Sequence, residues 1–71
     1  MHQQDYENAI VNYDKAIELD PNNAISFANR GSAYHMLGNY KKAIADYEKA
    51  MELGLSPEQS QDIEELLETL R

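Results

Sequence analysis

Apolar residues recur at steps of three and four along the first part of the chain, the spacing of one face of an α-helix. This stripe consists of Ala9, Ile10, Tyr13, Ala16 and Ile17. Asp5 precedes the stripe and can cap free backbone N–H groups. Pro21 follows it and disfavours helical backbone at Asp20. The pattern predicts a helix that begins at Asp5 and ends at Leu19.

The next two apolar segments, about residues 24–37 and residues 40–53, have the same helical spacing. Gly38 stands between them and can supply the left-handed backbone that closes a helix. Asn39 is suited to cap the helix that follows, and Gly54 is suited to end it. A second and a third helix are therefore predicted.

A fourth helix is predicted over the end of the chain. Ser56 and Gln59 have the spacing of a capping box, with Pro57 at the first helical position. The apolar stripe that follows consists of Ile63, Leu66, Leu67 and Leu70. Because no segment alternates with the period of a β-strand, the sequence predicts an all-α fold of about four helices.

The first and third predicted helices are copies of one pattern. Residues 6–19 and 40–53 lie 34 positions apart and are identical at eight of fourteen aligned positions. A period of this length is typical of proteins that stack helix-turn-helix units, each of which buries its apolar face only against its neighbours. We therefore expect an antiparallel stack of helices, a piece of an α-solenoid.

Small and large residues alternate on the faces that are expected to meet. The small ones let neighbouring helices approach closely, and the aromatic ones fill the spaces between them. The small residues are Ala9, Ala16, Gly31, Ala43 and Ala50. The aromatic residues are Tyr13, Phe27, Tyr34 and Tyr47.

Composition narrows the possible functions. The 71 residues carry 13 acidic and 6 basic side chains, a formal charge of −7, which opposes binding to nucleic acid and to anionic membrane surfaces. The chain has no cysteine, so no disulfide and no thiolate site is possible. Together with the lack of a signal peptide or an apolar span, this predicts a cytoplasmic protein.

No arrangement of residues indicates catalysis, a metal or a cofactor. His2 and His35 are far apart and have no acidic or histidine partner at metal-binding spacing. Glu64, Glu65 and Glu68 lack the loop spacing of a calcium site and are expected to form a solvated face. We expect the protein not to be an enzyme.

The matched positions resemble the tetratricopeptide repeat, a helix-turn-helix unit of about 34 residues. Residues 24–55 resemble one complete repeat, in which Phe27, Gly31 and Tyr34 lie on the first helix. Residues 5–23 resemble the second helix of a partial repeat, and residues 56–71 resemble a capping helix. The resemblance covers nearly all of residues 1–71 and implies a single domain.

Members of this family hold a peptide or partner segment along a groove built from the first helix of each repeat. The residues that the resemblance places in this groove are Ile25, Ala28, Asn29, Ser32, His35 and Met36. Asn29 coincides with a residue that binds the peptide backbone in chaperone-binding members. Gln59 and Ile63 stand where those members have basic residues, so the resemblance implies no complete clamp for a carboxylate. A peptide or protein partner is therefore expected.

Two departures from the family pattern leave alternatives open. Arg30 occupies a position more often held by leucine, and we expect its guanidinium to reach water. The first helix of the first repeat is missing, which predicts an uncovered apolar stripe. Either the chain is part of a longer array, or the stripe pairs with another copy in a homo-oligomer. The residues expected to self-associate are Ala9, Ile10, Tyr13 and Ile17.

Overall fold

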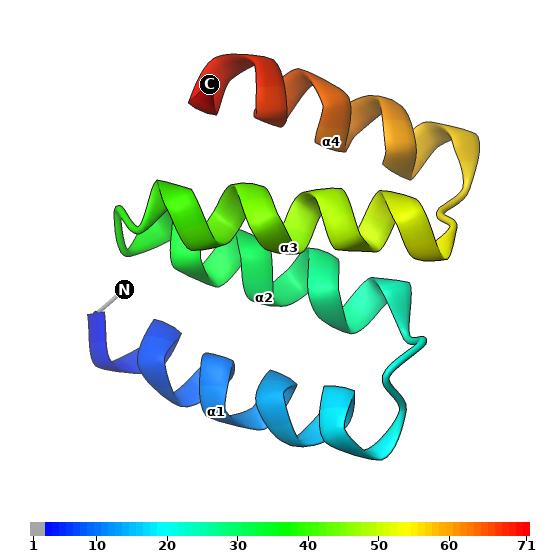
Figure 1. Cartoon of the computed structure of the whole chain (residues 1–71). Helices are drawn as coiled ribbons and strands as arrows, with labels where there is room; N and C mark the ends of the chain where they lie inside the picture. Colours follow the sequence, from blue (N-terminus) through cyan, green and yellow to red (C-terminus); the bar gives the residue numbers. More distant parts are fainter. Residues whose placement is uncertain (1–2) are drawn as a thin grey trace.

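The computed structural model describes residues 3–71, which form helices joined by short turns and contain no strand (Figure 1). His2 lies outside these described residues. The helices, in chain order, are α1 (Gln3–Leu19), α2 (Ala24–Met36), α3 (Tyr40–Leu53) and α4 (Pro57–Leu70). The predicted all-α fold is confirmed.

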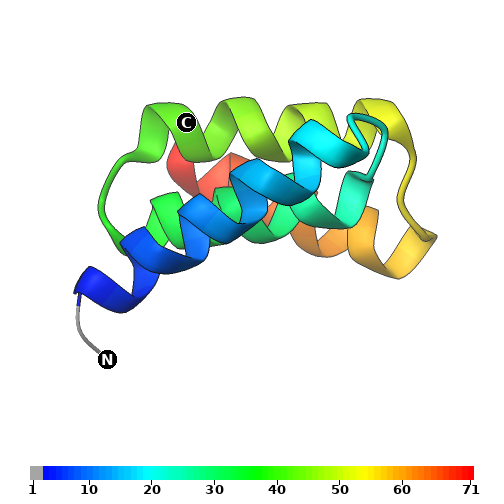
Figure 2. The ribbon, with the colours of Figure 1, turned by 90° about the horizontal axis from the view of Figure 1, so that it is seen from below.

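Consecutive helices run antiparallel and lie side by side (Figure 1). The central pair is α2 and α3, while α1 packs on α2 and α4 packs on α3. Figure 2, turned by 90°, places α1 in front of this pair and α4 behind it. The arrangement confirms the predicted stack of helical hairpins.

Most helix ends form at the residues that the sequence indicated. The Asn39 side chain accepts a hydrogen bond from the Lys42 N–H, and Ser56 forms the capping box with Gln59. Gly38 has φ of +81°, the left-handed backbone that glycine adopts without strain. These local signals therefore set the turns before α3 and α4 largely by themselves.

The start of the first helix was predicted wrongly. Helix α1 begins at Gln3, so Asp5 lies in its first turn and is not the cap. A carboxylate in the first turn still stabilises a helix, because it faces the positive end of the helix dipole. Asn23, which was not predicted as a cap, accepts a hydrogen bond from the Ser26 N–H at 3.2 Å and caps α2.

The centre of the core is the contact between Tyr47 of α3 and Gly31 of α2. Tyr47 is 1% exposed, and Ala43 and Ala50 on the same face of α3 are fully buried. A Cβ atom at Gly31 would lie 2.9 Å from Tyr47 Cδ1 and 3.2 Å from the Ala43 carbonyl oxygen. The two helices can therefore approach this closely only because residue 31 has no side chain.

Helix α4 closes the other side of the core. Its Ile63 and Leu67 are buried and join Phe27 of α2 and the α3 residues in one apolar cluster. Ile44 and Met51 of α3 pack against the same cluster. The apolar stripe predicted for the fourth helix thus faces the core.

Arg30 differs from its prediction, because its guanidinium lies in an ion-pair network and is not directed to open water. Its Nε and Nη2 atoms donate to the two carboxylate oxygens of Asp46, each at 2.8 Å. Its Nη1 atom donates to Asp14 Oδ1 at 2.8 Å. This network links α1, α2 and α3. Because the Asp46 carboxylate is buried, its negative charge requires the neighbouring Arg30 guanidinium.

Replacing Gly31→Ala is expected to destabilise the protein by roughly 1 kcal/mol, although alanine is the better helix former by about 1 kcal/mol. The reason is the new methyl group, which collides with the Tyr47 ring and a backbone carbonyl. Urea unfolding measures the difference. Asn12→Ala, at an exposed position of α1 away from this contact, is the control and should leave stability unchanged or slightly raised. A stabilising Gly31→Ala would contradict the close approach.

Replacing Arg30→Met is expected to cost about 2–3 kcal/mol, because it leaves the buried Asp46 carboxylate without its cation. Adding Asp46→Leu to the same variant should recover much of the loss. Asp14→Asn, which removes only the exposed arm of the network, should cost less than about 1 kcal/mol. Equal losses for Arg30→Met and Asp14→Asn in chemical unfolding would argue against this role of Asp46.

Candidate functional site

The outer face of α2 is the candidate site, because it carries exposed side chains between two neighbouring helices. Ile25 and Met36, near its two ends, are 45% and 59% exposed, so apolar surface is open at both ends of this face. Asn29 and Ser32 lie between them and are exposed as well. The face therefore offers both apolar and hydrogen-bonding groups to a partner.

A hollow of about 190 Å³ lies between α2 and α4. It is lined by Ile25, Ala28, Asn29, Leu55, Gln59, Asp62 and Ile63. Its walls are thus mainly apolar, with two amides and one carboxylate among the lining side chains.

A second hollow of about 200 Å³ lies between α2 and α1. It is lined by Asp5, Tyr6, Ala9, Tyr13, Asn29, Ser32 and Ala33. Asn29 belongs to both hollows and stands between them. None of the side-chain hydrogen bonds among the described residues involves Asn29, so its amide is available to a ligand.

The six groove residues expected from the sequence do not all meet. Ile25, Ala28 and Asn29 line the hollow beside α4, and Ser32 joins Asn29 in the hollow beside α1. His35 and Met36 line neither hollow. The ring of His35 instead packs edge-on against the Tyr40 ring, with centroids 5.7 Å apart.

The charge of the two hollows is negative. Asp62 lines one and Asp5 lines the other, and no lysine or arginine lines either. In the hollow between α2 and α4, the amide of Gln59 and the apolar side chain of Ile63 line the wall together with Asn29. The sequence analysis did not identify Leu55 and Asp62, which reach the site from the turn before α4 and from α4 itself. The available signal for Asp62 was its position one helical turn after Gln59.

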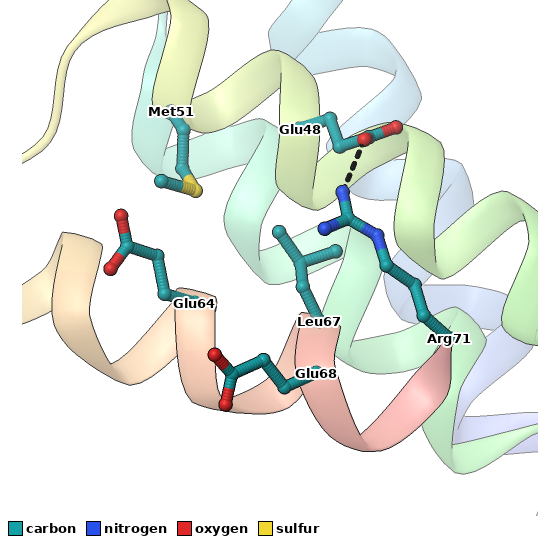
Figure 3. A pocket seen from close by; sticks show the side chains of 6 residues that line it. All are labelled: Glu48, Met51, Glu64, Leu67, Glu68 and Arg71. Atoms are coloured by element: carbon teal, nitrogen blue, oxygen red, sulfur yellow. Dashed lines mark hydrogen bonds and ion pairs between the residues drawn. The ribbon is translucent and has the colours of Figure 1, made fainter.

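A larger hollow of about 450 Å³ lies between α3 and α4 (Figure 3). Met51 and Leu67 contribute its apolar lining, and Glu64 and Glu68 project from α4 beside them. Arg71 donates a hydrogen bond to Glu48 across α3 and α4. Two glutamates expected on a solvated face thus line this hollow.

The described residues contain no group of three or more histidine, aspartate or glutamate side chains placed to hold a metal ion. None of the four helices described here combines the length and the apolar character that crossing a membrane requires.

The apolar stripe of α1, which was predicted to be uncovered, is covered in part, so this prediction is corrected. Ile10 is buried and Ile17 packs against the core cluster, so these two residues are used within the chain. Ala9 and Tyr13 remain half-buried and line the hollow beside α2. The difference arises because the apolar stripe of α1 is wide enough to have two sides, of which α2 takes one.

The antiparallel hairpins, the glycine-to-tyrosine contact and the exposed face of α2 define a helical-repeat protein. A model of the family described as TPR repeat matches residues 1–38, and the model of the tetratricopeptide repeat matches residues 24–53. The chain belongs to the tetratricopeptide repeat family. Such repeats generally mediate protein–protein interaction.

Curated relatives match about half of the chain. The small glutamine-rich tetratricopeptide repeat-containing protein beta of Homo sapiens is 48% identical over 40 residues, 56% of this chain and 13% of that protein. Serine/threonine-protein phosphatase 5 of Homo sapiens is 61% identical over 31 residues, 44% of this chain and 6% of that protein. Tetratricopeptide repeat protein 28 of Homo sapiens is 43% identical over 41 residues, 58% of this chain and 2% of that protein. The chain therefore matches only a small part of each relative.

Because of Tyr47, the stability of the core beneath the site is expected to depend on pH in the alkaline range. Its hydroxyl is buried and has no hydrogen-bond partner among the described residues. Burial raises the pKa of this phenol above its ordinary value, because the interior disfavours the phenolate. The unfolded chain therefore loses this proton at a lower pH than the folded chain, and stability should fall as pH rises above about 10.

We expect Tyr47→Phe to lessen this alkaline fall in stability, because the variant has no proton to lose at this position. At neutral pH it should be neutral or slightly stabilising, since it removes an unsatisfied buried hydroxyl. Urea unfolding at about pH 8 and about pH 11 measures both effects. Tyr40→Phe, at a half-exposed ring, is the matched control. The same change in pH dependence for both variants would disprove the assignment.

Proposed function

We propose that the chain is a non-enzymatic protein-interaction module that binds an extended peptide segment along the outer face of α2. The observation that carries the proposal is the position of Asn29, whose free amide stands between two hollows. An amide can donate to and accept from a peptide backbone at once, while the hollows on either side receive side chains.

The chemistry of the hollows indicates which segment would fit. Ile25, Leu55 and Ile63 favour a large apolar side chain in the hollow beside α4. Asp62 beside it, Asp5 in the other hollow and the overall charge of −7 favour a lysine or arginine nearby. The ligand class is therefore an apolar segment with a neighbouring basic residue.

The proposal includes a division of labour along the chain. Residues 24–55 are the complete repeat that presents the site, and residues 5–23 are the second helix of a partial repeat on one flank. Residues 56–71 are a capping helix whose Gln59, Asp62 and Ile63 form the other wall of the hollow.

Selection from a random displayed-peptide library tests the function without assuming a partner. We expect the enriched peptides to combine a large apolar residue with lysine or arginine. In NMR titrations these peptides should shift the side-chain amide of Asn29 and the methyl groups of Ile25 and Ile63.

The decisive variant is Asn29→Ala, which should weaken the selected peptides about tenfold, because a peptide backbone loses its hydrogen bonds there. Asn12→Ala, at an exposed asparagine of α1 outside both hollows, is the matched control and should bind as the unchanged chain does. Peptides that bind both variants equally, or whose shifts map to the hollow between α3 and α4, would overturn the proposal.

A further inference from the structure

The charge of the chain is divided unevenly along its length. Residues 21–45 contain three of the six basic residues and none of the 13 acidic ones, so this segment has a formal charge of +3 and the rest of the chain has −10. One of the three cations, Arg30, is neutralised by the two carboxylates of its ion-pair network. The other two, Lys41 and Lys42, are exposed and take part in none of the ion pairs within the part of the chain that the structure describes.

Exposed apolar side chains lie beside these two lysines, at the turn between α2 and α3. Met36, the last residue of α2, is 59% exposed, and Tyr40, the first residue of α3, is 50% exposed. The Tyr40 ring contacts the ring of His35, and the Lys42 ammonium lies 5.3 Å from the centre of the Tyr34 ring. Side chains of both helices thus gather around one turn. We call the following five residues the turn patch: His35, Met36, Tyr40, Lys41 and Lys42.

The turn patch is open to a partner and has a fixed backbone. Figures 1 and 2 show the turn between α2 and α3 at one edge of the stack, with no helix lying across it. Within the turn, the Gly38 N–H donates to the His35 carbonyl at 3.0 Å, and the Asn39 N–H donates to the Tyr34 carbonyl at 2.9 Å. A surface that is already ordered loses little conformational entropy when a ligand binds.

The turn patch is separate from the hollows described above. None of its five residues lines either hollow beside Asn29, or the hollow between α3 and α4. Its charge is also opposite, because the hollows beside Asn29 carry Asp5 and Asp62 and the turn patch carries two lysines. The two surfaces therefore suit different ligands.

We propose that the turn patch binds an acidic segment of a partner protein that has an apolar or aromatic residue between its carboxylates. Lys41 and Lys42 pair with the carboxylates, which find no other unpaired cation on this part of the chain. The apolar residue packs on Met36 and on the ring of Tyr40, which are exposed next to the two lysines. The coincidence of unpaired positive charge and exposed apolar surface carries the inference.

A short acidic segment fits better than a longer polyanion or a second copy of the chain. At physiological ionic strength, charges more than about 8 Å apart are largely screened, so a short segment at the turn patch interacts mainly with the two lysines. A nucleic acid continues beyond the turn patch and meets the rest of the chain, whose charge of −10 repels its phosphates. A second copy brings its own charge of −7, which opposes association.

A pair of synthetic peptides tests the site. In the glutamate peptide, a phenylalanine stands between two short runs of glutamate, and both ends are blocked so that no terminal carboxylate is present. In the matched glutamine peptide, each glutamate is replaced by glutamine. We expect the glutamate peptide to bind at least about tenfold more tightly. In NMR titrations it should shift the backbone amides of Lys41 and Lys42 and the methyl group of Met36. Equal binding of the two peptides would overturn the proposal.

Charge reversal at the turn locates the site. Lys41→Glu combined with Lys42→Glu should weaken the glutamate peptide at least about tenfold. This variant should stay folded, because acidic side chains in the first turn of α3 face the positive end of the helix dipole. The control combines Lys15→Glu with Lys49→Glu, which changes the formal charge equally but lies in the second halves of α1 and α3. Equal weakening by both variants would show that binding follows overall charge, and would overturn the proposal.

The apolar contact has a test of its own. Met36→Ser should weaken the glutamate peptide about threefold, because its phenylalanine loses apolar surface to pack on. Val11→Ser, at another exposed apolar residue on α1, is the control and should bind the peptide as the unchanged chain does. Unchanged affinity in Met36→Ser would contradict the proposed recognition of an apolar residue.

The other possible occupants give distinct results. In light scattering, an oligomer that Lys41→Glu with Lys42→Glu dissociates would assign the turn patch to a second copy and overturn the proposed partner. A single-stranded oligonucleotide of equal charge that binds there more tightly than the glutamate peptide would also overturn it. Asn29→Ala should bind the glutamate peptide as the unchanged chain does, so the turn patch and the peptide groove succeed or fail separately.

Discussion

The flat ring of Tyr47 lies against the bare backbone of Gly31, and the rest of the structure depends on this contact. It brings α2 and α3 together closely enough to bury Ala43 and Ala50 completely. Because side chains in a protein interior are close-packed, the approach of this pair fixes where the flanking helices can lie. Helix α4 packs on the far side of α3, and α1 packs on α2, where Arg30 ties three helices together through Asp14 and Asp46.

The same constraint explains why some helix faces of this small fold remain exposed. A helix between two neighbours has one face left, and on α2 that face carries Asn29 between two hollows. The outer helix α1 has a neighbour on only one side of its stripe, so Tyr13 and its flanking alanines are half-buried where their counterparts on α3 are closed off. In a repeat protein, the faces that no neighbouring helix covers are the ones left for a partner. Under the proposed function, the charge of −7 favours a basic partner.

Local rules predicted most of the fold. Gly38, Asn39 and the Ser56 capping box each act within a few residues, so the sequence alone placed the turns before α3 and α4. The 34-residue repeat indicated the stack. The failures were tertiary. Arg30 could be recognised as unusual, but its partner Asp46 lies 16 residues away and is brought near only by folding. The hollow beside α4 mixes residues of a turn and two helices, so the sequence indicated Asn29 but not Asp62.

Native-state hydrogen exchange, resolved by NMR, tests most directly whether the α2–α3 pair is the stable centre of the fold. Amides buried in the middle of a cooperative unit exchange only when that unit opens, so protection reports the free energy of each opening. If the glycine-to-tyrosine contact holds the structure together, the amides around Ala43 and Tyr47 should open only in global unfolding. Those around Ala9 and Tyr13 should then exchange through a separate opening of lower free energy. Equal protection of α1 and α3 would show that the two copies of the repeated segment, residues 6–19 and 40–53, are equally stable, and would contradict the central role of the contact.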